Sequence, residues 1–309
     1  TYCSEEGENY FTTDIGIYNK EFVDALYNKQ LYLLEDPSER FMQLEDPYDD
    51  LTRARNVVRG EDYKWDTAYY NGHQYIYFGI LPAILIFLPF HIITHQYLKA
   101  SFVVFMFSIF VLILLKEILL IVINRYFKDV PFKNVFYSLI ALLSGSLILY
   151  ANGIPRVYEL AIVSGLFFAL LGILFVLKSL ENDNKKYRSL FLGTLFLALS
   201  VACRPTDLFI SLIILPYIIS LFINLLKTKD RKGLLKLILS VGIPYMTVGI
   251  RLMFYNYVRF NSPFEFGASY QLTLNNMKEL KSGIYSIPAG LFTNLFGIPR
   301  FIMEFPFID

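Results

Sequence analysis

YKWDTAYYNGHQYIYFGILPAILIFLP, residues 63–89, is the stretch in which this chain changes from charged and aromatic to almost purely apolar. Within it, Asn71 and Gly72 separate two short aromatic-rich runs, 67–70 and 73–76. Asn-Gly tolerates the positive φ that both central positions of a type I′ turn require, so the pattern predicts a small β-hairpin. Tyr69, Tyr70, Tyr75 and Tyr77 suit the water–lipid boundary, because a tyrosine ring lies in lipid while its hydroxyl reaches water. The hairpin is therefore predicted to join a water-facing head to a membrane-embedded body.

The composition points to a membrane protein with several spans. Of 309 residues, 55% are hydrophobic and only 18% are charged, which is too apolar for a soluble domain of this size. A helix needs ~20 apolar residues to cross the hydrocarbon. Runs that approach or exceed this length lie at about 76–94, 101–124, 134–151, 158–178, 189–203, 207–226 and 234–257. We predict an all-α polytopic membrane protein with six or seven transmembrane or re-entrant helices.

The predicted domains are an acidic, α-rich head with the hairpin (1–74), a transmembrane domain (75–258) and an interfacial C-terminal segment (259–309). The head carries 16 Asp and Glu against 7 Lys and Arg, a net charge of −9, whereas the remainder carries 11 against 21, or +10. Because the chain lacks an initiator Met and a signal-like segment, we expect a further helix upstream that delivers the head across the membrane.

Charged loops predict the orientation. Connections rich in Lys and Arg (125–133, 178–188 and 227–236) alternate with connections poor in them (150–156, 204–207 and 256–265). The positive-inside rule places the first set in the cytoplasm and the second set outside with the head. This holds only if the run at 76–94 does not cross fully. Either Pro82 and Pro89 break that run into a re-entrant piece, which we expect, or the positive-inside interpretation fails.

Several function classes lack support in the sequence. With two cysteines and three histidines, the chain has no disulfide framework and no Cys/His cluster with metal-ligand spacing. It has no GxxxxGK[ST], no GxGxxG after a strand and no HExxH, and its basic residues lie in short loops rather than on one nucleic-acid-binding face. We expect no cofactor. Four head carboxylates offer oxygen ligands to a divalent cation, but turns and a solvated acidic surface are favoured instead: Asp46, Asp49, Asp50 and Asp66.

Two residues stand out as candidates for chemistry. Asp14 begins the first predicted helix, 14–32, where it is either stabilised by the helix dipole or poised as a general base above the membrane. Arg204, in CRPTD, lies between two apolar runs. Its guanidinium either binds an anionic headgroup, since its fork matches phosphate oxygens, or simply reaches for water from a helix end.

Other polar residues mark the same predicted outer layer. Arg156 and Glu159 begin one run, and Asn256 and Arg259 end another. With Arg204, these arginines would form a cationic layer beneath the acidic head. Such an arrangement would hold a lipid-linked anion at the membrane surface and present it to carboxylates above.

Short segments across most of the chain carry a family resemblance: TTDIGIYNKEFVDALYNKQLYL, LEDPYDDLTRAR, WDTAYYNGHQYIYFGILPAILIFLPFHIIT, VYELAIVSG, CRPTD and NYVRFNSPFEFGASYQLT. They resemble bacterial multi-pass membrane proteins of the GT-C glycosyltransferase superfamily, in the protein O-mannosyltransferase and aminoarabinose-transferase group (glycosyltransferase family 39-like). The resemblance implies that a sugar passes from a polyprenyl-phosphate donor to an unidentified acceptor on the outer face of the bacterial plasma membrane.

The resemblance also implies site residues. Its members carry an essential aspartate soon after their first helix, and Asp14 in TTDIGIY matches that position. The family's acidic Asp-Glu pair is here Asp14-Ile15, so Asp66 in KWDTAYY is the second candidate. Arg204, with Arg259, would contact the donor phosphate.

The leading hypothesis is therefore an inverting, nucleotide-independent glycosyltransferase. The alternative is a transporter or flippase for a lipid-linked or anionic solute, motivated by Lys116, Glu117 and Arg251 inside apolar runs, where charges usually face a cavity or a partner. Such transporters are often built from internal repeats, and the sequence shows none. A third possibility is an inactive membrane scaffold.

Overall fold

Five long apolar helices dominate the fold. The computed structural model describes residues 20–77, 79–127, 129–146, 148–153, 157–181, 183–279 and 286–297. The helices long and apolar enough to cross a membrane are α5 (Ala100–Tyr126), α8 (Val157–Glu181), η2 with α9 (Asp183–Cys203), η3 with α10 (Pro205–Lys227) and α11 (Arg231–Phe260). This confirms the predicted class, an all-α membrane protein. The exact number of spans stays a prediction.

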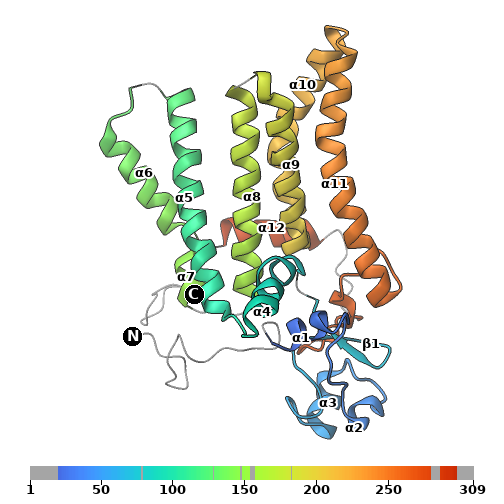
Figure 1. Ribbon diagram of the computed structural model, residues 1–309. Helices are drawn as coiled ribbons and strands as arrows, with labels where there is room; N and C mark the ends of the chain where they lie inside the picture. The colour runs from blue at the N-terminus through green and yellow to red at the C-terminus, as the bar shows by residue number, and fades with distance from the viewer. Residues whose placement is uncertain are drawn as a thin grey trace.

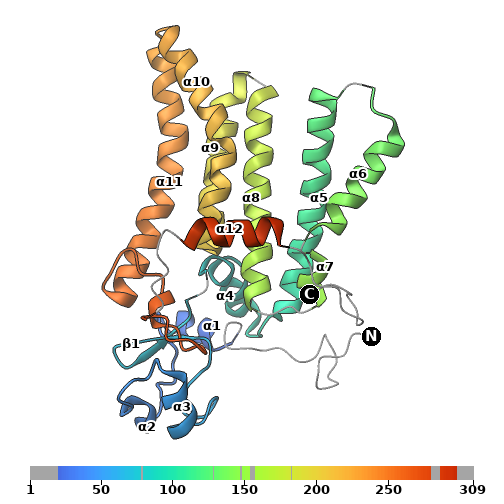
Figure 2. The ribbon, with the colours of Figure 1, turned by 180° about the vertical axis from the view of Figure 1, so that it is seen from behind.

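Small residues let α8 and α9 pack closely. A Cβ added to Gly172 would lie 2.8 Å from the carbonyl oxygen of Gly193. Close backbone approach of this kind is typical of helix pairs in membranes, where packing rather than water exclusion drives association. Thr194 ties the pair to α11 by donating a hydrogen bond of 2.6 Å to the carbonyl of Ser240. The helices consequently stand side by side in the order α5, α8, α9 and α11 (Figure 1, Figure 2).

The run at 76–94 is shorter as a helix than predicted. Residues 81–94 form one helical stretch that contains the π-helical turn η1 (Ala83–Phe87) and α4 (Leu88–Thr94); Pro82 lies at its start, and the helix continues through Pro89. Fourteen helical residues rise only ~21 Å, against ~30 Å for the hydrocarbon. Both α4 and the beginning of α5 lie near the head (Figure 1). The geometry therefore favours a piece that does not cross.

The single helix predicted at 134–151 is wrong. The structure divides this run into α6 (Phe132–Ser144) and α7 (Ile148–Gly153). The Ser146 hydroxyl donates to the carbonyl of Leu143 at 2.7 Å, which satisfies a group that the helix end leaves unpaired. Gly145 and Ser146 together end the helix because neither residue favours its continuation.

The helices alternate in direction, so the loops fall into two layers. The chain passes from α9 into η3 at Arg204, at the end of the bundle that lies against the head; we call this the head end (Figure 1). It passes from α10 into α11 through residues 228–230 at the opposite end (Figure 2). The basic and non-basic loops that the structure describes thus lie at opposite ends of the bundle, as their alternation predicts.

The head contains short helices and the predicted hairpin. The helices are α1 (Glu21–Tyr27), α2 (Glu39–Met42) and α3 (Asp50–Asn56), and the antiparallel strands are β1 (Ala68–Tyr70) and β2 (His73–Tyr75). Asn71 has a φ of 51° and Gly72 a φ of 86°, so both central turn positions are left-handed. The Asn-Gly prediction is confirmed.

A distant segment completes the head. After α11 the chain returns through η4 (Ala268–Tyr270), and the Leu272 amide donates to the carbonyl of Thr67 at 2.8 Å. The Asp66 amide donates in turn to the carbonyl of Leu272 at 3.1 Å. Residues 261–279 therefore extend the hairpin and fix the head to the end of α11. The last described helix, α12 (Ser286–Phe296), lies across the bundle (Figure 2).

Candidate functional site

The junction of head and bundle contains a cluster of polar side chains around Asp66. The Asp66 Oδ1 atom accepts hydrogen bonds of 2.8 Å from the hydroxyl of Tyr77 and 2.8 Å from the amide of Gln271. The Tyr77 hydroxyl also lies 2.9 Å from that of Tyr158, in the first turn of α8. The head, the strand exit, the returning segment and a membrane helix thus meet at one carboxylate.

Burial keeps the Tyr77 phenol of this cluster protonated. Loss of water around Tyr77 raises its pKa well above the usual range, and its hydrogen bonds with Tyr158 and Asp66 act in the same direction. Tyr77 is therefore a neutral phenol that donates to Asp66 at any physiological pH. Asp66 itself has a left-handed backbone with a φ of 61°, a conformation that aspartate adopts more readily than most residues other than glycine.

Gly79 brings the same stretch of chain onto α9. A Cβ at this position would lie only 1.9 Å from the carbonyl oxygen of Cys203, so no side chain fits. Tyr77 of the Asp66 cluster lies only two residues before Gly79. The packing of Gly79 on Cys203 therefore brings this stretch of chain to the end of α9. Arg204 follows directly at that end, where its side chain is exposed. Its guanidinium makes no hydrogen bond or ion pair with another described residue.

The structure gives Arg259 a different environment. Its side chain is buried, and it donates from Nη1 to the carbonyl of Ile76 at 2.8 Å and from Nη2 to Asn256 Oδ1 at 2.9 Å. The guanidinium carbon also lies 3.7 Å from the centre of the Tyr255 ring. Arg259 and Asn256 therefore join the end of α11 to the exit of the hairpin, and protein encloses the guanidinium that was predicted to contact a phosphate.

The remaining predicted site residues are distributed unevenly. Glu159 is buried in the first turn of α8, adjacent in sequence to Tyr158 of the cluster. Asp14 and Arg156 lie outside the described residues. Hydrogen bonds thus link Asp66 to the first turn of α8, which also carries Glu159, and Gly79 joins the same stretch of chain to the end of α9 before Arg204.

The other head carboxylates have local roles. Asp46 accepts from the Tyr48 amide at 2.9 Å in an Asx turn, and Asp49 caps α3 through the Thr52 amide at 2.8 Å. Asp50 pairs with the buried Arg53. Among the described residues there is no group of three or more His, Cys, Asp or Glu side chains placed to hold a metal ion.

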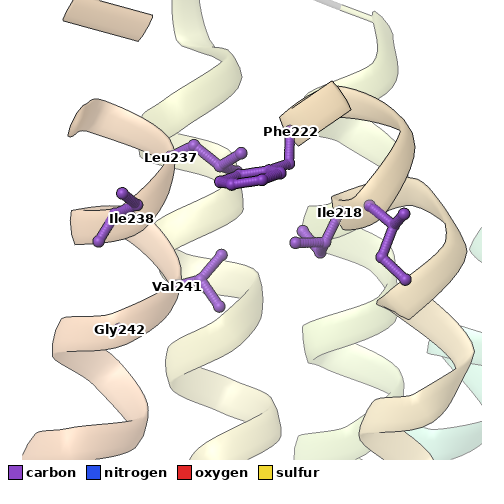
Figure 3. A pocket seen from close by; sticks show the side chains of 7 residues that line it. Ile218, Phe222, Leu237, Ile238, Val241 and Gly242 are labelled. Atoms are coloured by element: carbon purple, nitrogen blue, oxygen red, sulfur yellow. The ribbon is translucent and has the colours of Figure 1, made fainter. Parts of the chain in front are cut away.

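An apolar cavity of about 340 Å³ lies elsewhere, between α10 and α11 (Figure 3). Its lining contains no ionisable side chain and consists of Ile218, Ile219, Phe222, Leu237, Ile238, Val241 and Gly242. It lies in the part of these helices nearer to the turn at 228–230 than to the head. Hydrocarbon fits such a lining, whereas the polar groups that could carry chemistry lie at the junction.

Three members of the cluster were missed by sequence reasoning. Tyr77 was noted only as an interfacial aromatic, and Tyr158 and Gln271 were not singled out. Gln271 lies 205 positions from Asp66, and no local pattern signals that pairing. A tyrosine at the first turn of an apolar run, beside a glutamate, was the one available signal for Tyr158.

Comparison with known proteins adds no family assignment, because no protein-family model, curated protein or solved structure matches this chain.

Proposed function

We propose that this protein transfers a sugar from a polyprenyl-phosphate donor to an acceptor at the outer face of the bacterial plasma membrane, with the head outside. The observation that carries the proposal is the Asp66 cluster. Asp66, a carboxylate of the head, is linked through Tyr77 to the first turn of α8, and the same stretch of chain packs at Gly79 on the end of α9 that bears Arg204.

The reaction assigns a role to the carboxylate. Asp66 would take the proton from an acceptor hydroxyl as its oxygen attacks the anomeric carbon of the donor sugar. The new carbon–oxygen bond forms as the bond between that carbon and the phosphate oxygen breaks. Polyprenyl phosphate leaves with the electron pair, and attack from the opposite side inverts the anomeric configuration. Tyr77 and Gln271 hold the carboxylate in place because both donate hydrogen bonds to Oδ1.

Arg204 would bind the phosphate of the donor. The leaving group gains negative charge as the bond breaks, and a guanidinium fork matches two phosphate oxygens. The exposed side chain of Arg204 lies at the head end of the bundle and makes no hydrogen bond or ion pair with a described residue, so its guanidinium is available for this role. Arg259 contributes instead by fixing the end of α11 to the hairpin.

The test is transfer from a radiolabelled polyprenyl-phosphate hexose by the full chain in proteoliposomes, with a membrane extract as the source of acceptor. Asp66→Asn is expected to lower the rate by about 10²- to 10⁴-fold, the usual contribution of a general base. Asp183→Asn, which changes an exposed carboxylate at the opposite end, is the matched control and should retain the wild-type rate. Normal transfer by Asp66→Asn would remove Asp66 from the mechanism.

Asp14→Asn belongs in the same assay, because Asp14 is the position that the family resemblance selects. If Asp14→Asn alone abolishes transfer, the base is Asp14 and Asp66 only organises the junction. Uptake of the labelled lipid without any covalent product would favour the transporter class. The two intramembrane charges that motivate that alternative, Lys116 and Glu117, pair with each other at 2.9 Å on one helix.

A further inference from the structure

Arg204 and Asp207 carry opposite charges three residues apart but do not pair with each other. The Asp207 amide donates to the Arg204 carbonyl at 2.9 Å, which is a backbone contact. Among the described residues, neither the Arg204 guanidinium nor the Asp207 carboxylate makes an ion pair or a side-chain hydrogen bond. Arg204 is close enough to attract the Asp207 carboxylate, but no direct ion pair fixes either group. Charges at the end of an apolar bundle usually face a ligand, a polar cavity or a partner.

The carboxylate of Asp207 points at α8. A Cβ added to Gly165 would lie 2.2 Å from Asp207 Oδ2 and 3.6 Å from the Cβ of Cys203. The carboxylate therefore occupies space that exists only because residue 165 has no side chain. Asp207 lies in the first turn of the 3₁₀ segment η3, and its side chain turns toward the neighbouring helix α8.

This carboxylate lies below the Asp66 cluster on one face of α8. Gly165 follows Tyr158 by seven residues, which is close to two helical turns and a rise of ~10 Å. The chain that links the Asp66 cluster to the end of α9 is also short. Gly79 packs on Cys203, and Tyr77 of the cluster is two residues away, or at most ~7 Å of chain. The Asp66 cluster and the Asp207 carboxylate are thus linked both along α8 and through the packing of Gly79 on Cys203.

We propose that Asp207 is a positioning residue that selects the sugar of the donor, accepting hydrogen bonds from its hydroxyl groups while Arg204 holds the phosphate. This inference rests on the proposed function. A carboxylate accepts bonds from two adjacent hydroxyls of a hexose, and such charge-assisted bonds are stronger than neutral ones. The pair would orient the anomeric carbon toward the head, where Asp66 lies.

The test distinguishes recognition of the sugar from recognition of the phosphate. Binding of two probes to the full chain in nanodiscs is measured: polyprenyl phosphate without a sugar, and the matching polyprenyl-phosphate hexose. Asp207→Asn is expected to weaken binding of the hexose probe about 10- to 100-fold and to leave the sugar-free probe unchanged. Arg204→Ala is expected to weaken binding of both probes.

Gly165→Ala disturbs the carboxylate of Asp207 through a change in α8. Its new Cβ displaces Oδ2 of Asp207, while the next nearest atoms, at 3.3 and 3.6 Å, tolerate it. The same selective loss of the hexose probe is expected. Gly249→Ala is the matched control, since a Cβ there meets no atom within 4 Å, and it should bind both probes as the wild type does.

The outcomes distinguish this inference from the proposed function. If Asp207→Asn and Gly165→Ala change the binding of both probes equally, or of neither, Asp207 does not read the sugar, although the donor site stands. If the wild type binds neither probe, the proposed function fails and the inference fails with it. Melting curves of each variant identify a loss of binding that comes from unfolding.

Discussion

The two ends of the helix bundle differ in how they treat polar groups. At the head end, Asp66, Tyr77 and Gln271 are joined by short hydrogen bonds, and Arg259 is buried with both terminal nitrogens paired. At the opposite end, basic residues such as Lys229 and Arg231 are exposed. The nearest cavity, between α10 and α11, has a wholly apolar lining (Figure 3).

This difference separates two uses of charge. Exposed charges near water contribute little to stability, and basic loops of this kind chiefly set the orientation of a membrane protein. Buried polar groups must be paired, and they tolerate little change. Substitutions at the head end should therefore disturb both stability and function, whereas matched substitutions at the opposite end should disturb neither.

Gly79→Ala should have the largest effect on stability. The added Cβ would meet the carbonyl oxygen of Cys203 at 1.9 Å, and a backbone atom in the middle of the junction cannot move aside. We expect a loss of about 3 kcal/mol or more, at or beyond the upper part of the range for overpacking. Thermal unfolding in detergent measures it, with Gly249→Ala as the control. Equal melting temperatures for the two variants would show that the junction is not tightly packed.

Local sequence signals were sufficient for the elements of this fold. Asn71 and Gly72 predicted the hairpin turn because positive φ is a property of single residues. The apolar runs predicted the long helices, and Pro82 marked the start of the short helix within 76–94, whereas the helix continues through Pro89. Where two weak local signals coincided, at Gly145 and Ser146, a single helix was wrongly expected.

The candidate site depended on contacts that no local signal encodes. Asp66 meets Gln271, and Arg259 meets the carbonyl of Ile76 across 183 positions. Charge alone placed Arg204 and Arg259 in one class, because both end apolar runs at the same face. Packing separated them, leaving Arg204 exposed and enclosing Arg259 between aromatic rings. From the sequence alone, an arginine at a helix end does not reveal whether its guanidinium will be exposed or enclosed by protein.

Arg53→Met should have the next largest effect, because it tests the part of the head that the returning segment completes. Arg53 is fully buried in α3 and donates to the carbonyls of Pro47 and Thr273, the latter on the returning segment. Methionine keeps the volume but leaves both carbonyls unsatisfied, at about 1–3 kcal/mol each. Limited proteolysis should then release residues 261–279 sooner.

Arg55→Met is the control for this experiment, since Arg55 lies in the same helix and is exposed. We expect its cleavage pattern to match that of the wild type. If the Arg53 and Arg55 variants are cleaved at the same rate, the buried arginine does not hold the two segments together.

A smaller effect should depend on pH. Tyr97, between α4 and α5, donates to Asp24 of α1 at 2.6 Å, and this hydrogen bond raises the pKa of Tyr97 to about 12. Folding therefore favours the protonated phenol. The stabilisation is complete below the unfolded pKa of ~10 and is lost as the pH rises toward 12. Tyr97→Phe should lower the melting temperature slightly at pH 8 and remove this alkaline loss.

Tyr126→Phe is the comparison for that measurement, because Tyr126 is 61% exposed at the opposite end of the bundle. Its variant should follow the wild-type curve from pH 8 to pH 12. If the melting temperature of Tyr97→Phe still falls between pH 8 and pH 12, another group causes the transition. The hydrogen bond between Tyr97 and Asp24 would then not be what stabilises the head end in this pH range.

The smallest effect, and one of opposite sign, is expected for Gly242→Ala beside the apolar cavity. A Cβ at Gly242 meets no atom within 4 Å, and the residue lies inside α11, where glycine costs about 0.5–1 kcal/mol relative to alanine. The methyl group also extends into the cavity that Gly242 lines. The melting temperature in detergent should therefore rise by a degree or two, while binding of polyprenyl-phosphate hexose stays unchanged. A fall in stability comparable to that of Gly79→Ala would mean that both ends are packed alike, and the contrast between them would no longer hold.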